Sequence, residues 1–285
     1  EHAQDHSQIK VQTGWASLDG MLGGGWDRNS LNILMGETNV GKSLWLQNIA
    51  VNCADCGYNV LYITLEMSEK KVLKRLGSMR LRIPINDYDK LSCNTEYMRD
   101  KIDALHKGGA KGAQDLFDGK KMGKIITKFY AAGTSTVDQY DKLIKDIYDK
   151  KGVKIDVIVV DYLTLIAPPK GLDVNLYLKG KHLAEGLRSV AAKWEIPAIT
   201  AIQVAKDAWN MSDMTLQSIP ESKAIAETAD TFFGIIRTEE MKRQNLYRLK
   251  LLKQRDGDFS RSQSKFDLNT EFLTIENDSF VDGLN

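Results

Sequence analysis

The chain has 285 residues, enough for one large α/β domain or two small ones and for a substantial hydrophobic core. Its 39 Lys and Arg residues nearly balance its 38 Asp and Glu residues, so net charge does not indicate a nucleic-acid binder, and a polyanion site would need local clustering. Three cysteines do not make a disulfide framework, and no apolar stretch reaches the roughly 18 residues that a bilayer span requires. We therefore expect a soluble, cytoplasmic protein that does not act at a membrane.

The first 12 residues are polar and have no apolar period, so we expect the end of a linker there and a folded domain over residues 13–285. The chain begins with Glu1 rather than Met, which leaves room for a preceding domain. Within the domain, strand and helix patterns alternate. Apolar, β-rich runs cover residues 31–36, 59–67, 124–130, 155–166, 196–203 and 231–237. Several of these runs lack polar alternation, which is typical of parallel strands buried on both faces.

Two further patterns complete the predicted fold. Residues 136–152 have a helical period, with Thr136 as N-cap and Gly152 just past the end. From about residue 245, three short strands separated by turn residues predict an antiparallel extension of the sheet. The sequence therefore predicts an α/β fold with a mostly parallel sheet, flanking helices and an antiparallel C-terminal part.

The segment GETNVGKS lies between a buried strand and a helix and matches the phosphate-binding pattern G-x-x-x-x-G-K-S. Backbone N–H groups of such a loop and of the following helix N-terminus surround phosphate oxygens. The lysine reaches the β and γ phosphates, and the serine hydroxyl faces Mg²⁺. The nucleotide-binding residues are therefore predicted to be Gly36, Glu37, Thr38, Asn39, Val40, Gly41, Lys42 and Ser43.

Three polar residues follow later apolar strands, where strand ends line the ligand crevice of open α/β sheets. Asp161 follows four apolar residues and is the predicted second Mg²⁺ residue. Glu66 is a candidate for activating water, although a surface glutamate beside a helix start explains it as well. Gln203 is placed to sense the γ-phosphate, and the pattern alone does not favour this role over a structural one.

Residues 205–224 are long, polar and irregular for a connector in a compact domain, as functional loops are. We expect contacts with a nucleic-acid phosphate backbone from this loop. The candidates are Lys206, Glu221, Ser222 and Lys223. A solvated loop without a ligand is an equally good interpretation of the same residues.

Lys253 and Arg255 are two residues apart and therefore lie on one side of a predicted strand. Such a pair of cations can complete the nucleotide site of another subunit, as an arginine finger does. Taken alone, surface charges on an edge strand explain the pair better. The Cys53 to Cys56 spacing has no second pair and no nearby histidine, so we expect buried helix cysteines and no structural metal.

Taken together, the motifs resemble the RecA-like motor domain of hexameric replicative helicases, the DnaB-like family. Seven segments occur in the order and rough spacing of that family: TGWASLDGMLGGG, GETNVGKS, LYITLEMS, VIVVDYLTLI, AIQVAKDAW, ESKAIAETAD and LKQRDGD. The match covers nearly the whole chain from about residue 12. NVLYITLEM and QVAKDAW look closest to the primase-associated helicases of T4-type phages.

The resemblance implies roles for the residues already named. Lys42 and Ser43 bind ATP and Mg²⁺, Asp161 holds the metal through its water shell, and Glu66 polarises the attacking water. Gln203 senses the γ-phosphate, and Lys253 and Arg255 reach into the neighbouring subunit's site. The loop around Glu221, Ser222 and Lys223 lines a central channel and grips single-stranded DNA. Many bacterial relatives have Arg followed by Glu-Ser-Gly there, so we expect Lys223 to supply the charge that Pro220 does not.

The implied assembly is a homo-hexamer that works with a primase and a helicase loader. The family also has an N-terminal helical domain and a linker helix, of which residues 1–12 would be the remnant. The implied function is ATP-dependent translocation on single-stranded DNA and separation of the duplex at a replication fork. Two alternatives stay open: a RecA-like recombinase filament, and a loader or scaffold that binds nucleotide without motor activity.

Overall fold

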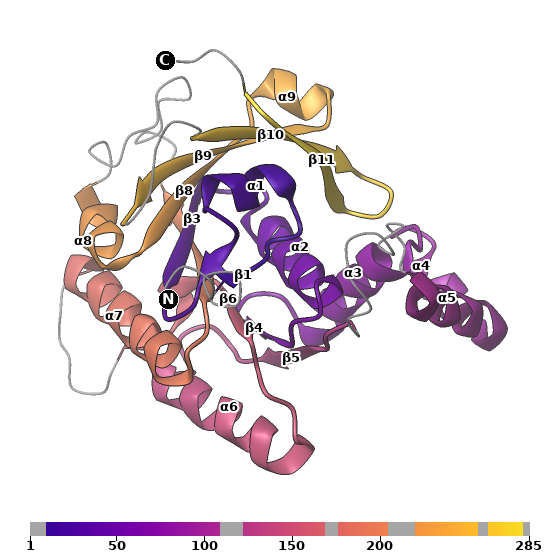
Figure 1. Ribbon diagram of the computed structural model, residues 1–285, viewed down its shortest axis with the longest axis horizontal. Helices are drawn as coiled ribbons and strands as arrows, with labels where there is room; N and C mark the ends of the chain where they lie inside the picture. The colour runs from indigo at the N-terminus through magenta and orange to yellow at the C-terminus, as the bar shows by residue number, and fades with distance from the viewer. Residues whose placement is uncertain (1–9, 109–121, 169–175, 205–219, 256–261, 282–285) are drawn as a thin grey trace, which may run out of the picture.

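The fold is built on a nine-stranded sheet (Figure 1). The computed structural model describes residues 10–108, 122–168, 176–204, 220–255 and 262–281. From edge to edge the strands are β11 (Thr274–Phe280), β10 (Gln263–Asn269), β9 (Leu246–Gln254), β8 (Thr231–Ile236), β3 (Leu31–Glu37), β7 (Ala198–Val204), β6 (Val157–Asp161), β4 (Val60–Thr64) and β5 (Ile125–Phe129). The strands from β8 to β5 run parallel, and β9, β10 and β11 continue from β8 in antiparallel order. The predicted α/β sheet is confirmed.

Helices cover both faces of the sheet (Figure 1). The first face carries α1 (Ala16–Met21), α2 (Lys42–Asp55) and α3 (Glu69–Leu81), and the second carries α6 (Val137–Lys151), α7 (Leu176–Trp194) and α8 (Pro220–Thr228). Because side chains alternate along a strand, Leu34 of β3 packs into the first layer, and Ile33 and Met35 pack into the second. Each layer therefore has its own apolar core, and the sheet separates the two.

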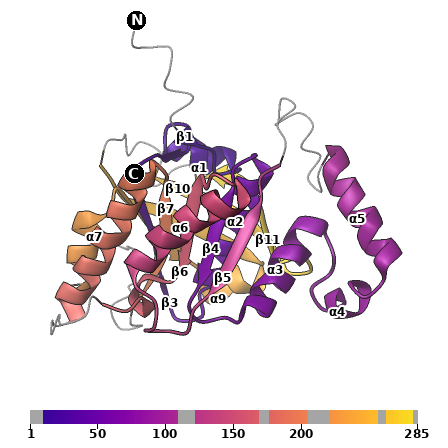
Figure 2. The same ribbon diagram turned by 90° about the horizontal axis from the view of Figure 1, so that it is seen from below.

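Smaller elements surround this body. β1 (Lys10–Val11) pairs with β2 (Trp26–Asp27), so the last residues of the expected linker belong to the folded body, and Val11 is buried. A 3₁₀ turn, η3 (Leu163–Leu165), follows β6, and α9 (Glu239–Arg243) follows β8. α4 (Tyr88–Leu91) and α5 (Thr95–Gly108) lie beyond α3, away from the sheet in both views (Figure 1, Figure 2).

The helix predicted at 136–152 is confirmed at both ends. Thr136 and Gln139 form a reciprocal capping box, in which the Thr136 N–H donates to Gln139 Oε1 at 2.9 Å. Gly152 follows the last helical residue with a φ of 61°, a left-handed conformation that glycine adopts without strain. Local sequence signals were sufficient here because the cap and the stop lie within the helix's own residues.

Three expected boundaries differ clearly from the structure. The strand expected over 59–67 ends at Thr64. The strand expected over 155–166 ends at Asp161, and the apolar residues beyond it form η3 instead. Of the loop expected over 205–224, residues 220–224 belong to α8, which begins at Pro220, and residues 205–219 lie outside the described residues. Proline suits the first helical position because its missing N–H would have no partner there. Among the described residues, no helix is both long enough and apolar enough to cross a bilayer.

Candidate nucleotide site

The predicted phosphate-binding loop connects β3 to α2 by a tight turn whose shape depends on its glycines. Gly41 has a φ of 105°, and a Cβ there would lie 2.4 Å from the Tyr247 hydroxyl. A Cβ on Gly36 would lie 2.5 Å from Val40 Cγ1. Neither position has room for a side chain, so the turn keeps its backbone close to its neighbours and its N–H groups at the start of α2.

Lys42 is the first residue of α2 and its side chain folds back into this turn. Its Nζ donates to the carbonyl oxygens of Gly36 at 3.2 Å and Glu37 at 2.7 Å. Burial lowers the pKa of Lys42, while the negative charges of Glu66 and Asp161 act in the opposite direction. The structure thus places one partly desolvated cation against the loop between β3 and α2.

The oxygens of Ser43 and Asp161 lie side by side beneath the loop. Ser43 Oγ donates to Asp161 Oδ1 at 3.0 Å, and the Tyr62 hydroxyl donates to Oδ2 at 2.9 Å. Burial raises the pKa of Asp161 to about 6; the two hydroxyl hydrogen bonds lower it and the nearby Glu66 raises it. A buried carboxylate beside a hydroxyl is a hard oxygen donor set, so these residues fit Mg²⁺.

Glu66 and Gln203 complete the group at the carboxyl ends of the parallel strands. Glu66 is exposed two residues beyond β4, and its charge reaches both Lys42 and Asp161. Gln203 lies opposite Gly36 in the ladder between β7 and β3, and its Nε2 donates to Thr38 Oγ1 at 2.8 Å. Residues from the predicted phosphate-binding loop and from the ends of β4, β6 and β7 therefore lie close together.

Lys253 and Arg255 do not belong to that group. β9 runs antiparallel to β8, and Gln254 pairs with Thr231, the first residue of β8. The end of β9 therefore lies beside the beginnings of the parallel strands, whereas the phosphate-binding loop lies at their carboxyl ends. Arg255 forms an ion pair with Asp230, with 3.0 Å between Nη1 and Oδ1.

Lys253 is bound to the end of α8. Its Nζ donates to the carbonyl oxygens of Ala226 at 2.6 Å, Glu227 at 3.0 Å and Ala229 at 2.7 Å. An ammonium group has three N–H donors, so these three acceptors use all of them. Burial lowers the pKa of Lys253, and Arg255 lowers it further.

The residues predicted to contact DNA are only partly within the described structure. Lys206 lies outside the described residues. Glu221, Ser222 and Lys223 are in the first turn of α8, so the expectation that they belong to an irregular loop is wrong for the backbone. Helix formation from Pro220 onwards explains the difference.

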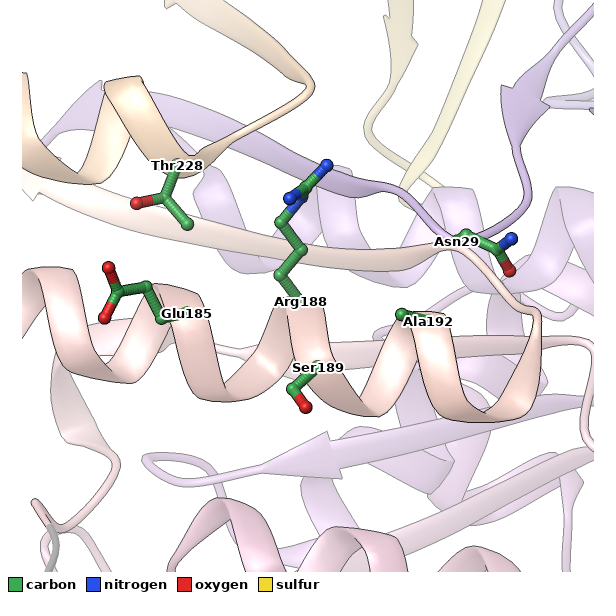
Figure 3. A pocket seen from close by; sticks show the side chains of 6 residues that line it. All are labelled: Asn29, Glu185, Arg188, Ser189, Ala192 and Thr228. Atoms are coloured by element: carbon green, nitrogen blue, oxygen red, sulfur yellow. The ribbon is translucent and has the colours of Figure 1, made fainter.

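Two adjoining hollows lie beside the beginnings of the parallel strands, at the opposite end of these strands from the phosphate-binding loop. The larger, of about 550 Å³, is bounded by α7, the end of α8 and the turn before β3 (Figure 3); its lining residues are Asn29, Glu185, Arg188, Ser189, Ala192 and Thr228. The smaller, of about 200 Å³, shares Asn29 and Arg188 with it and also contains Asp230 and Arg255. Neither hollow includes the residues around Lys42.

Sequence reasoning missed four polar residues: Tyr62, Asp230 and Tyr247 lie beside predicted residues, and Arg188 pairs with Asp230. Tyr62 carries a hydroxyl within a fully buried strand, which was a signal that it has a partner. Asp230 directly precedes a strand, as Arg255 directly follows one. Arg188 in α7 and Tyr247 in β9 gave no signal, because their partners are distant in sequence.

Comparison with known proteins adds to this geometry. The family model described as "DnaB-like helicase C terminal domain" matches residues 10–274. The DnaB-like replicative helicase of Enterobacteria phage T4 is 31% identical over 269 residues, covering 92% of this chain and 54% of that protein. The replicative DNA helicase DnaB of Geobacillus stearothermophilus is 25% identical over 284 residues, 93% of this chain and 56% of its own length. The chain thus spans about half the length of these curated relatives.

A solved structure shows the same fold. This structure, which is described as an ATPase domain, matches with a TM-score of 0.77 and 18% identity, covering 96% of this chain and 93% of that one.

Proposed function

Because the chain belongs to the DnaB-like helicase C-terminal domain family, we propose that it is the ATP-driven motor of a replicative DNA helicase. The observation that carries the proposal is the group at the phosphate-binding loop, where Lys42, Ser43 and Asp161 meet within hydrogen-bonding distance of one another or of the loop. A domain that only bound nucleotide would need neither Glu66 beside this group nor cations at the opposite end of the parallel strands.

Each residue at the loop has a role that its position supports. Lys42 would exchange its bonds to the loop carbonyls for the β and γ phosphates of ATP. Ser43 and Asp161 would hold Mg²⁺, which when bound neutralises phosphate charge. Glu66, exposed and close to Lys42, would polarise the attacking water. Gln203 would report the γ-phosphate to the rest of the chain through Thr38.

Lys253 of β9 and Arg255, which directly follows this strand, would serve a second copy of the chain. β3 has seven residues, so the two ends of this strand are about 20 Å apart. Arg255 lies near the beginning of β3 and cannot reach the loop at its other end. A site that needs Arg255 is therefore completed between subunits, which makes hydrolysis depend on assembly. Lys253 would join Arg255 there only by giving up its bonds to α8.

The remaining parts of the proposal follow the family. We propose a homo-hexamer around single-stranded DNA, with Lys206, Glu221, Ser222 and Lys223 facing the strand. A solved structure titled "The Structure Of A DnaB-Like Replicative Helicase And Its Interactions With Primase" matches with a TM-score of 0.75 and 18% identity over 95% of this chain and 62% of that one. Its title supports a primase partner. A loader partner and a location in the cytoplasm, that of the host if a phage encodes the chain, complete the proposal.

The test is ATP hydrolysis by the purified chain over a range of protein concentrations, with and without single-stranded DNA. We expect turnover per chain to rise steeply with both, because the sites form between subunits. Lys42→Ala should abolish it, whereas Lys151→Ala, at the exposed end of α6, should not. Activity that is independent of concentration and of DNA would contradict the motor. Helical filaments that exchange strands would favour the recombinase, and ATP binding without turnover would favour the scaffold.

A further inference from the structure

Arg255 is held by a carboxylate that has no free acceptor position. Asp230 Oδ2 accepts from the Leu31 N–H at 2.9 Å and from Arg188 Nε at 3.0 Å. Its Oδ1 accepts from Arg188 Nη2 at 2.9 Å and pairs with Arg255 Nη1 at 3.0 Å. A carboxylate has about four lone-pair positions, and all four are used here.

The backbone of Asp230 is fixed by Leu31 of β3 and by Arg255, which follows β9. Its N–H donates to the Leu31 carbonyl and its carbonyl accepts from the Arg255 N–H, each at 2.9 Å. Asp230 thus connects the beginning of β3 to the residue after β9, and its side chain has no freedom to rotate away. The Asp230 side chain is 14% exposed, whereas Arg255 is 43% exposed and faces the smaller hollow.

Two guanidinium groups share this single carboxylate. Figure 3 shows the Arg188 side chain extending from α7 into the space between Thr228 and Asn29. Together with Asp230 the two arginines carry one net positive charge at the hollow, so the cluster still attracts a phosphate. Asp230 contacts Arg255 at Nη1, and a guanidinium has five N–H donors, so Arg255 can bind another anion while Asp230 still holds it.

We propose that Asp230, fixed by Arg188, is a positioning residue that holds Arg255 ready for the nucleotide site of a neighbouring copy. This inference rests on the proposed function and adds two residues to it. A preorganised cation accelerates phosphoryl transfer more than a mobile one, because no reorganisation is needed when charge develops. Asp230 itself does not contact the nucleotide.

The first test is Asp230→Asn in the 285-residue chain. The amide keeps the size but offers one acceptor in place of two, and its own N–H groups face the arginine donors. We expect kcat for ATP hydrolysis to fall about tenfold or more while KM for ATP stays within about twofold, because the variant's own phosphate-binding loop is at the opposite end of the parallel strands. The matched control is Asp141→Asn, which removes a carboxylate that accepts from Lys193 and Trp194 at 2.8 Å each. It should cost stability without changing kcat.

Mixing variants separates positioning from a folding defect. In mixtures with Lys42→Ala chains, some interfaces pair the intact loop of the Asp230→Asn chain with an intact Arg255 from the other chain. Turnover should then recover, as it should for Arg255→Ala mixed in the same way. No recovery for Asp230→Asn where Arg255→Ala recovers would overturn the inference, and so would a kcat close to that of the unmodified chain.

Three further outcomes keep the test decisive. If Asp230→Asn does not fold, Arg188→Gln decides, because it leaves the bonds of Asp230 to Leu31 and Arg255 in place. We expect kcat to fall several-fold at unchanged KM, and an unchanged kcat would overturn the inference. If Arg255→Ala itself hydrolyses ATP normally, the intersubunit function fails; if Arg255→Ala is inactive and Asp230→Asn is normal, only the role of Asp230 fails.

Discussion

At the scale of single residues, Asp161 carries the clearest conflict between stability and activity. Its carboxylate is buried beneath the phosphate-binding loop, and burial raises its pKa from 3.8 to about 6. The folded chain therefore binds a proton in a pH range in which the unfolded chain has lost it. The free energy of unfolding falls as pH rises through that window, since ionised Asp161 is costly in the folded state.

Asp161→Asn should accordingly stabilise the chain while abolishing ATP hydrolysis. Two pKa units correspond to about 3 kcal/mol, so at pH 8 and without Mg²⁺ we expect the variant to melt at a higher temperature. Tyr62 and Ser43 can rotate their hydroxyls to suit the amide. The gap in Tm should close as pH falls through 6 towards 4, because the unmodified carboxyl is then protonated. A gap that is independent of pH would contradict the effect, and calorimetry at several pH values measures it.

At the scale of elements, the helix α8 is stabilised at its C-terminus by the side chain of Lys253 from the strand β9. The last carbonyls of a helix have no partner within it, and Lys253 donates to three carbonyls at this end. A cation there also interacts favourably with the helix dipole. Lys253 therefore ties β9 to the helix that begins with the residues proposed to face DNA.

Lys253→Met keeps most of the aliphatic stem and removes the ammonium group, so it tests this role. We expect the free energy of unfolding to fall by about 1 to 3 kcal/mol, and amide exchange at the end of α8 to accelerate. Lys265→Met, on an exposed position of β10, is the matched control and should change neither quantity. Equal stability of both variants would show that Lys253 does not hold α8.

The elements also show which parts of the structure were predictable. The six apolar runs and the helix at 136–152 depend on residues close in sequence, and the structure has a strand at each run and the helix itself. The contacts of Asp230 with Leu31 and Arg188 span 199 and 42 residues, so no local pattern encodes them. Lys253 and Arg255 were recognised as a pair, but only the fold shows that their partners differ.

At the scale of the whole molecule, the residues around Lys42 and the cluster around Arg255 lie at opposite ends of the parallel strands. Lys42 and Asp161 are at the carboxyl ends of the parallel strands, whereas Arg255 is beside their beginnings. The rigid sheet between them keeps one group from acting on the other within a chain.

Arg255→Ala should therefore separate binding from hydrolysis. We expect ATP binding to be unchanged and hydrolysis to fall about a thousandfold or more, the scale usual for an arginine finger. Nucleotide titration and steady-state turnover measure the two quantities. Arg243→Ala, an exposed cation of α9, is the control. Near-normal turnover of Arg255→Ala would remove Arg255 from the mechanism.

The separation of these two groups also determines how copies of the chain add up. A contact that joins the Arg255 side of one copy to the phosphate-binding loop of the next copy is heterologous. Such contacts add further copies in a row unless the rotation between copies closes the row into a ring. In an open row, the copy at one end has a phosphate-binding loop with no Arg255 beside it, and the copy at the other end presents an Arg255 with no loop. Closure removes both unmatched ends at once. A closed ring is then the smallest assembly in which every chain both gives and receives a complete site.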